Sequence, residues 1–471
     1  MSEKLKEREW KKTQMNKKRS AFSGKIGYVL SAAGASVGLG NIWRFPYLAA
    51  KYGGGIFLLV YIILALTFGY TMIVAESALG RMTRKSPVGA FRSFAKGKKV
   101  GWLSFGGWIN AIIPVLIVPY YSVIGGWVVK YLFEYIRGNG NKLAEDGYFS
   151  GFISNGGATE ICFVIFCMFT LVIIYAGVQN GIERVSKIMM PILIILSVII
   201  AIYSVTRPGA IEGVKYFLVP NVKNFSWMTV VAAMGQMFYS LSIAMGILIT
   251  FGSYMRKDTS IEDSTRNVEI FDTAIAMMAG LMIIPAVFAF SGGDPDTLQA
   301  GPSLMFITIP KVFANMGFGT AVGILFFVLV LFAAVTSSIA LTESAVSTFE
   351  DELGWGRKKA TILTGVIMIA LGTLSCLGYG PLDFVKIIGM QFLDFFDFLT
   401  NSVMMPIAAL MTSLLVSRVI GVDKIEEEIR HGESAFRRKK IFVVMIKYLC
   451  PIFALIILAS SVANAFGWIA M

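Results

Sequence analysis

The stretch Gly34-Ala35-Ser36-Val37-Gly38-Leu39-Gly40-Asn41-Ile42-Trp43-Arg44-Phe45-Pro46-Tyr47 interrupts the first long apolar segment of the chain. It places three glycines, an asparagine, an arginine and a proline inside a run that is otherwise hydrophobic. A helix in lipid must satisfy its own backbone, so this composition indicates a broken helix that lines a cavity. Polar side chains at such depth usually mark a functional site.

A second segment is interrupted in the same way. Gly235-Gln236 and Tyr239-Ser240-Leu241-Ser242-Ile243-Ala244-Met245-Gly246 bring small and polar residues into the middle of the sixth apolar segment. Breaks at matching positions of two five-helix halves indicate an inverted-repeat transporter with a binding site at the membrane midplane. The alternative is that small residues only let helices pack closely. The clustered Gln, Asn, Ser and Arg favour a site.

The composition supports a membrane protein. Of 471 residues, 56% are hydrophobic and 15% are charged, against about 25% charged in soluble domains. The runs lack the alternation of barrel strands, so we predict an all-α polytopic protein with eleven transmembrane helices in a 5+5 inverted repeat, helices 1 and 6 broken. The predicted spans are 26–48, 54–80, 102–135, 160–176, 184–205, 227–254, 270–290, 320–349, 360–377, 384–416 and 441–467.

The same segments divide the chain into four parts. We expect a cytoplasmic amino-terminal segment, a ten-helix transporter core, a cytoplasmic loop and a last transmembrane helix. Their expected limits are 1–25, 26–416 (first repeat 26–205, second repeat 227–416), 417–440 and 441–471.

The net charge of +13 has an uneven distribution along the chain. Nine of the first 25 residues are Lys or Arg, and the segments 81–99 and 418–440 are also rich in both. Because cations gather in cytoplasmic loops, we expect a multi-pass protein of the plasma (inner) membrane with its amino terminus in the cytoplasm and, after eleven spans, its carboxyl terminus outside. The cations are dispersed over loops, which disfavours nucleic-acid binding.

The residues also argue against an enzyme. The chain has one histidine, His431, in a charged stretch, which leaves no histidine for a catalytic base or a metal cluster in the membrane. Gly34-Ala35-Ser36-Val37-Gly38 matches the G-x-S-x-G pattern of serine hydrolases, but that pattern needs a histidine and a strand-turn-helix setting. The cysteines have no C-x-x-C spacing and are expected to be buried free thiols: Cys162, Cys167, Cys376 and Cys450.

Hydroxyl and amide oxygens at the breaks, and a carboxylate in the seventh span, are suited to a hard cation such as sodium. The residues are Ser36, Asn41, Ser240 and Ser242 at the breaks and Asp272 in the seventh span. Thr336-Ser337-Ser338 adds three hydroxyls in the eighth span, although such hydroxyls most often bond only to the preceding turn.

Charged residues near the ends of the spans suggest gates. Arg44 is expected to pair with Asp394 or Asp397 on the outer side, and Arg19 with Asp351 on the inner side.

Taken together, these residues resemble the neurotransmitter:sodium symporters, in particular their bacterial amino-acid transporters. The resemblance runs from Arg19 to the eleventh span and is anchored by the first-helix stretch 34–47. The supporting segments are Gly53-Gly54-Gly55, Glu76 with Gly80-Arg81, Gly235-Gln236 through Ser242, Ser253-Tyr254, Thr336-Ser337-Ser338 and Glu350-Asp351-Glu352-Leu353.

The resemblance implies two sodium sites. The first is formed by Ser36, Asn41, Ser240, Asp272 and the substrate carboxylate. The second is formed by carbonyls of Gly34, Val37 and Ala333 and hydroxyls of Thr336 and Ser337.

It also implies a substrate pocket and two gates. The pocket residues are Ala35, Gly38, Leu39, Gly40, Ile117, Tyr121, Tyr239, Ser242, Met245, Ser338 and Leu341. The gate residues are Arg44 and Asp397 outside, with Tyr239 as a lid, and Arg19, Asp351 and Tyr254 inside.

Departures from the family pattern refine the expected substrate and ions. Monoamine carriers have an Asp where this chain has Gly38, so a substrate that brings its own carboxylate fits better. Chloride-dependent members have an Asn at the position of Asp272, beside the equivalents of Tyr61, Gln236 and Ser240, so we expect no chloride requirement. Met245 replaces a bulky aromatic residue, and its flexible side chain suits large apolar substrates.

We therefore expect a symporter that imports a hydrophobic or aromatic L-amino acid with two sodium ions by alternating access. The expected partners are the amino acid and membrane lipid, without nucleic acid and without a required oligomer. An alternative is a non-transporting amino-acid sensor that uses the same site, which net transport against a gradient would exclude.

Overall fold

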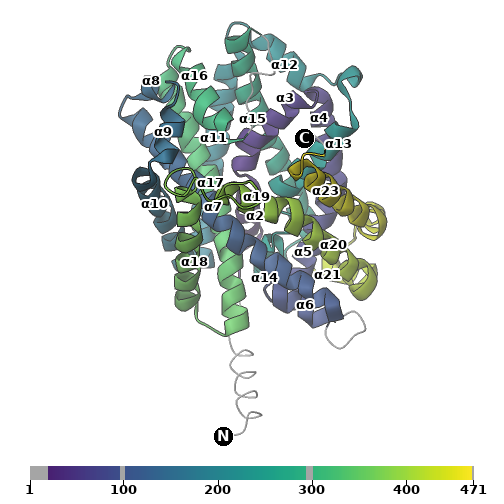
Figure 1. Ribbon diagram of the computed structural model, residues 1–471. Coiled ribbons are helices and arrows are strands. Elements are labelled where there is room, and N and C mark those ends of the chain that lie inside the picture. The colour runs from purple at the N-terminus through teal and green to yellow at the C-terminus, as the bar shows by residue number, and fades with distance from the viewer. Residues whose placement is uncertain (1–19, 96–100, 293–300, 469–471) are drawn as a thin grey trace.

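The computed structural model describes residues 20–95, 101–292 and 301–468. Within these ranges the chain is helical, and the only β-type pairings are the isolated bridges Gly54–Pro220 and Ile387–Met390. Figure 1 shows the helices packed as one bundle.

Nine helical segments of the described chain are long and apolar enough to cross a membrane. Five consist of one α-helix with or without a short lead-in turn, and the other four contain π-helical turns. The segments of the first half are Gly55–Thr83 (α4 Gly55–Leu64, η2 Ala65–Gly69, α5 Tyr70–Thr83), Gly101–Ile136 (η3 Gly101–Leu103, α7 Ser104–Ile136), Gly156–Tyr175 (α10) and Val178–Val205 (η4 Val178–Glu183, α11 Arg184–Val205).

The other five segments lie in the second half of the chain. They are Ile261–Ser291 (α15), Gly319–Leu353 (α17), Arg357–Leu377 (α18), Phe392–Ile420 (α19 Phe392–Asp397, η8 Phe398–Met404, α20 Met405–Leu414, η9 Leu415–Ile420) and Lys439–Ala465 (α22 Lys439–Val444, η10 Met445–Leu449, α23 Cys450–Ala465).

Two further spans are the broken ones. The first consists of α2 (Lys25–Ser36), η1 (Gly40–Arg44) and α3 (Phe45–Lys51), and the sixth consists of α13 (Trp227–Ser240) and α14 (Ile247–Tyr254). Each piece is shorter than a full span, and with the nine continuous segments they complete the predicted eleven. The predicted all-helical fold with breaks in helices 1 and 6 is confirmed.

Short helices connect the spans at both ends of the bundle. Their bounds are α6 Pro87–Ala95, α8 Gly140–Leu143, α9 Tyr148–Ser154, α12 Ala210–Leu218, η5 Val222–Asn224, η7 Leu304–Thr308, α16 Ile309–Ala314 and α21 Val422–Arg430.

The tenth span was predicted too early in the chain. The prediction began at residue 384, whereas the helix begins at Phe392 and continues to Ile420. Residues 384–391 are apolar enough to extend a span, but Gly389 and Ile388 adopt positive φ angles of 78° and 52°, which a helix does not contain. The predicted loop 417–440 accordingly holds the last turn of this span and the helix α21.

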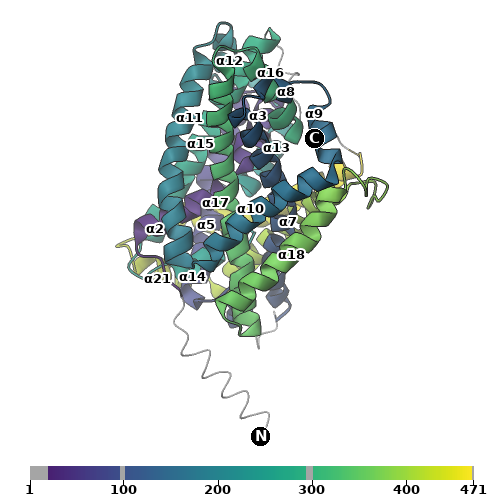
Figure 2. The same ribbon diagram turned by 90° about the vertical axis from the view of Figure 1, so that its left-hand side faces the viewer.

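The broken helices lie in the interior of the bundle. α2 contacts α11, α14, α15 and α17, whereas α10 and α18 cross one outer side and α20 and α23 cover another (Figures 1 and 2). The long helix α7 packs against α17, α10 and α18. This arrangement surrounds both breaks with protein, as unsatisfied backbone in a membrane requires.

Candidate functional site

The break in the first span begins where α2 ends. Val37 adopts an extended conformation (φ −78°, ψ 96°), and the Gly38 amide donates to the Asn41 side-chain oxygen at 3.1 Å in place of a helical partner. A Cβ on Gly38 would lie 2.6 Å from the Ser337 hydroxyl oxygen and 3.1 Å from that of Tyr121. Glycine here permits the close approach of α7 and α17 to the open backbone.

The break in the sixth span uses left-handed residues. Ser242, Ala244 and Gly246 have φ angles of 53°, 60° and 69°, so the chain leaves the helix between α13 and α14. The Ala244 amide donates to the buried carboxylate of Glu76 at 2.9 Å. The Ser242 hydroxyl donates to the Ala35 carbonyl at 3.0 Å, which joins the two breaks directly.

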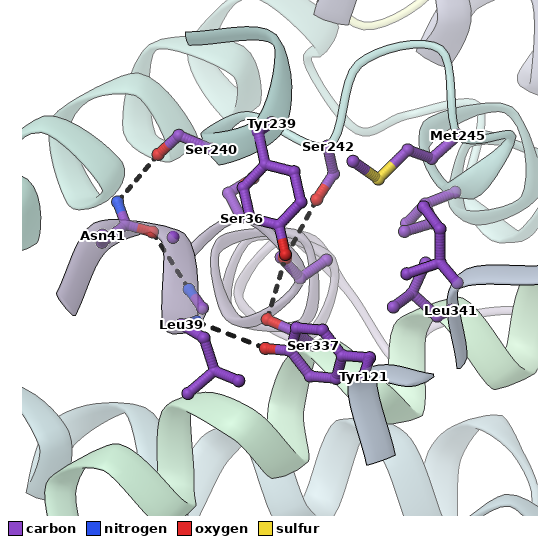
Figure 3. A pocket seen from close by; sticks show the side chains of 15 residues that line it. Ser36, Leu39, Asn41, Tyr121, Tyr239, Ser240, Ser242, Met245, Ser337 and Leu341 are labelled. Carbon is purple, nitrogen blue, oxygen red and sulfur yellow. Dashed lines mark hydrogen bonds between the residues drawn. The ribbon is translucent and has the colours of Figure 1, made fainter. Parts of the chain in front are cut away.

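The two breaks enclose a pocket with α7 and α17 (Figure 3). One end carries polar backbone, where the Leu39 amide donates to the Tyr121 hydroxyl at 3.3 Å. The other end is apolar. The lining residues are Ala35, Ser36, Gly38, Leu39, Gly40, Asn41, Ile117, Tyr121, Tyr239, Ser240, Ser242, Met245, Ile247, Ser337 and Leu341.

The structure brings ten of the eleven predicted substrate residues to this pocket. Ser338 is the exception, because its hydroxyl accepts a hydrogen bond from Thr170 on α10 at 3.3 Å and it does not line the pocket. Sequence reasoning missed Ile247, which lies two residues beyond Met245 where α14 resumes. Its apolar side chain one residue after the break glycine was the available signal.

Two of the residues predicted for the first sodium site, Asn41 and Ser240, meet around Asp272, whereas the Ser36 hydroxyl donates to the Ala32 carbonyl of its own helix at 3.2 Å. One carboxylate oxygen accepts from the Ser240 hydroxyl at 2.7 Å and the Asn41 amide at 2.8 Å, and the other accepts from the Tyr61 hydroxyl at 2.6 Å. Asp272 is 0% exposed, and no Lys or Arg of the described residues lies within ion-pair distance of it. A buried carboxylate with only neutral partners has an unbalanced charge, which a small cation would compensate. The donor set therefore fits sodium.

The residues predicted for the second sodium site are also close together. The Ser337 hydroxyl lies 3.3 Å from the Gly34 carbonyl oxygen and 3.3 Å from that of Val37. The Thr336 hydroxyl lies 3.2 Å from the Ala333 carbonyl oxygen. The Ser337 hydroxyl thus faces carbonyls that the end of α2 leaves without helical partners, whereas the Thr336 hydroxyl donates to the preceding turn of its own helix, at Phe332 (2.9 Å) and Ala333. All of these groups are hard oxygen donors.

The residues that the resemblance places at the equivalent of the chloride site bond to Asp272 or to the first span. Tyr61 and Ser240 donate to the Asp272 carboxylate. The Gln236 side-chain amide donates to the Gly40 carbonyl at 3.0 Å. The hydroxyls that an anion would need are already occupied by the carboxylate.

The predicted outer gate residues contact different partners. The Arg44 guanidinium is 5.5 Å from the centre of the Tyr239 ring, a cation–π contact. Asp397 accepts from the Tyr120 hydroxyl at 3.2 Å and the Asn401 amide at 2.5 Å. Among the described residues, Arg44 and Asp397 do not form the direct ion pair that was expected.

The inner gate is described in part, because Arg19 lies outside the described residues. Asp351 accepts from the Ser86 amide at 2.6 Å. The Tyr254 hydroxyl donates to Glu343 at 2.7 Å, and Glu343 also forms an ion pair with Arg357 at 2.5 Å. The sequence analysis did not identify Glu343 or Arg357. An acidic residue in the apolar span α17 was the signal for the first.

Comparisons with known proteins agree with this geometry. A model of the sodium:neurotransmitter symporter family matches residues 19–141 and 148–467. An uncharacterised sodium-dependent transporter of Bacillus subtilis, YhdH, is 36% identical over 88% of this chain and 91% of its own length. The human sodium- and chloride-dependent GABA transporter 2 is 26% identical over 87% of this chain and 75% of its own. The crystal structure of MhsT in complex with L-phenylalanine superposes with a TM-score of 0.84 at 36% identity, over 94% of this chain and 100% of MhsT.

Proposed function

The chain belongs to the sodium:neurotransmitter symporter family, and from this premise we propose that it imports a hydrophobic or aromatic L-amino acid with two sodium ions and without chloride. The family makes it a multi-pass, sodium-coupled membrane transporter rather than an enzyme. The substrate, the ions and the direction are the proposal.

The observation that carries the substrate class is the polarity of the pocket. The Leu39 amide and the Tyr121 hydroxyl offer hydrogen-bond donors for a carboxylate at one end. Carbonyls at the breaks, such as that of Ala35, offer acceptors for an ammonium group. Ile117, Met245 and Leu341 leave only an apolar surface for the side chain. A zwitterion with a large apolar side chain matches all three regions, and L-phenylalanine is the ligand in the MhsT complex.

The first sodium ion would be held by Ser36, Asn41, Ser240 and Asp272, together with the substrate carboxylate. The second would be held by Gly34, Val37, Ala333, Thr336 and Ser337. Both sets contain oxygens from the first span and from a second helix, so sodium stabilises the arrangement in which the break is closed around the substrate. That differential affinity couples the ion to the substrate.

Asp272 supports the absence of a chloride requirement. The Asp272 carboxylate carries a fixed negative charge and already accepts hydrogen bonds from the hydroxyls of Tyr61 and Ser240. A chloride ion at this place would be repelled by the carboxylate and would lack those donors.

The direction follows from the proposed orientation. The cation-rich amino-terminal segment places that end in the cytoplasm, with the carboxyl terminus outside after eleven spans. Each sodium ion that enters under a membrane potential of ~100 mV, inside negative, contributes about 2.3 kcal/mol. The division into residues 26–205 and 227–416 as the two repeats is part of this proposal.

Equilibrium binding tests the substrate class. We expect purified transporter to bind labelled L-phenylalanine in sodium chloride and equally in sodium gluconate, and not in choline chloride. Unlabelled large apolar amino acids should compete, whereas charged amino acids should not. Equal competition by phenethylamine, which has no carboxylate, would contradict the proposal.

A further inference from the structure

The segment that joins α12 to α13 presents apolar side chains to its surroundings. All ten residues from 218 to 227 are exposed, and Val222 and Trp227 are 78% and 79% exposed. Figure 1 shows the segment at the edge of the bundle, between the labels α12 and α13. A continuous apolar patch of this kind marks contact with another protein or with a membrane. The other exposed apolar residues of the segment are Leu218, Val219, Pro220 and Phe225.

The backbone of this segment is held against the outer ends of α3 and α4. Pro220 forms a β-bridge with Gly54, the residue before α4. Ser226 and Thr229 form a capping box at the start of α13, and the Thr229 hydroxyl donates to the Tyr52 carbonyl at the end of α3 at 3.1 Å. The apolar patch is therefore a fixed part of the fold.

The length of α13 places its first residue at the level of lipid head groups. α13 runs from Trp227 to Ser240, where the break of the sixth span begins. Breaks of this kind lie at the membrane midplane, and the 14 residues of α13 extend over about 20 Å. The head-group layer lies about 15 to 22 Å from the midplane. Trp227 therefore lies within this layer.

The aromatic residues at this level form two pairs. The rings of Phe225 and Trp227 have their centres 6.0 Å apart. The helix α23, which contacts α13, is followed by a second pair, Phe466 and Trp468, with centres 5.7 Å apart. Phe466 and Trp468 are 53% and 75% exposed. Tryptophan concentrates at membrane interfaces, because its ring has a large apolar body and one polar N–H group.

Lys223 favours a membrane over a second protein as the partner. It lies in the middle of the apolar patch and is exposed. Lysine is depleted from the centres of protein–protein interfaces. At a membrane surface, its apolar stem packs along the lipid while its ammonium group stays in the aqueous layer.

We propose that residues 218–227 are an interfacial membrane anchor, with Phe225 and Trp227 inserted among the lipid head groups. In the orientation proposed above, these lipids belong to the outer leaflet. The anchor fixes the depth of the outer halves of both broken spans, because the same segment is bonded to the end of α3 and begins α13. It requires the break to lie at the midplane, but it requires no particular substrate or ion.

Spin-label accessibility in lipid nanodiscs tests the anchor. A nitroxide is attached to Trp227→Cys in a Cys162→Ser background, because the other three cysteines are buried. Oxygen concentrates in lipid, whereas a polar nickel chelate stays in water. We expect the label at 227 to lose nickel accessibility and gain oxygen accessibility relative to a label at Lys142→Cys, an exposed position of α8. A label at Ile165→Cys, 52% exposed in the middle of α10, is the lipid reference.

Two results would overturn the anchor. Nickel accessibility equal to that at position 142 would place the segment in water. Protection from both reagents would show that protein covers it.

A second measurement needs no label. Lipids brominated near the head-group end of their acyl chains quench nearby tryptophans, so we expect Trp227→Phe to remove part of the quenching seen in wild-type protein. Quenching that is unchanged in this variant would also contradict the anchor. Neither measurement requires substrate or sodium, so failure of the proposed transport would leave both results valid.

Discussion

Asp272 is the residue on which the charge of the site depends. It is fully buried, and its neighbours are neutral donors from three elements. A negative charge in this position can hold sodium and exclude chloride at once. The same carboxylate thus accounts for two properties of the proposed transport.

We predict that Asp272→Asn makes transport dependent on chloride. Loss of the carboxylate frees the hydroxyls of Tyr61 and Ser240 to donate to an anion, so uptake should fall at least about ten-fold in gluconate and recover in chloride. Uptake at several chloride concentrations measures this. Asp258→Asn, at an exposed residue paired with Arg256, is the control. Identical uptake by the variant in both anions would refute the role of Asp272.

Gly40 lies directly under the ring of Tyr239. A Cβ on Gly40 would be 2.5 Å from the ring, whereas one on Gly235 would have its nearest atom, of Arg44, at 4.0 Å. We predict that Gly40→Ala displaces the ring and lowers amino-acid affinity at least about ten-fold, and that Gly235→Ala leaves it unchanged. Binding of labelled substrate to folded, monodisperse protein compares the two. Wild-type affinity in Gly40→Ala would show that the ring does not cover the substrate.

Much of the site was predictable at this scale, because glycines and polar residues in apolar runs are visible in the sequence. The orientation of Ser338 was not. Three consecutive helical residues turn through about 200°, so Thr336, Ser337 and Ser338 cannot all face the break. Only the packing of α17 against α10 decides that Ser338 meets Thr170.

At the scale of elements, the first span is held at its base by the fifth. The Ser23 amide donates to the Glu183 carboxylate at 2.9 Å, its hydroxyl donates to the other oxygen, and Lys187 pairs with Glu183 at 2.6 Å. These bonds must break if the base of α2 moves away from α11. Movement of the start of the first span away from the fifth span therefore requires Glu183 to release Ser23.

We predict that Glu183→Ala loosens the start of the first span. Loss of hydrogen bonds to a charged acceptor costs about 1.5–3 kcal/mol, so amide exchange in residues 20–30 should quicken about ten-fold or more. Hydrogen-exchange mass spectrometry measures this exchange rate. Lys187→Gln keeps both Glu183 carboxylate oxygens as acceptors for Ser23 and should change the rate much less. Unaltered exchange in Glu183→Ala would mean that other contacts hold α2.

Sequence periodicity located both broken helices, because hydrophobic length and composition depend on local residues. It misplaced the start of the tenth span at residue 384. The stretch before Phe392 is apolar, but the positive φ angles of Ile388 and Gly389 shape it into turns. Hydropathy does not report backbone conformation, so such ends need the structure.

At the scale of the whole molecule, α21 ties the tenth and eleventh spans to the second. Arg81 is 0% exposed, forms an ion pair with Glu428 at 2.7 Å and donates to the Thr259 carbonyl at 2.5 Å. Arg81 on α5 thus joins α21 to the segment that precedes α15. The sequence showed only a charged loop here, because its partners are far apart in the chain.

We predict that Arg81→Ala destabilises the protein strongly. Removal of Arg81 leaves the buried Glu428 carboxylate with only the longer contacts to Lys257 at 3.7 Å and His431 at 3.8 Å, and breaking a buried ion pair costs about 3–5 kcal/mol. The midpoint of thermal unfolding in detergent should fall clearly. Arg430→Ala, which removes an exposed partner of Glu426, should cost less than about 1 kcal/mol. Similar midpoints for both variants would contradict the structural role of Arg81.

Sodium-driven uptake in proteoliposomes distinguishes a sodium-coupled transporter from a protein that only binds the amino acid. With an inward sodium gradient and an inside-negative potential, we expect labelled L-phenylalanine to accumulate above its external concentration. Replacement of sodium by choline should abolish this accumulation, and replacement of chloride by gluconate should leave it intact. Undiminished accumulation in choline would contradict sodium coupling, and binding without any accumulation would identify a sensor instead of a transporter.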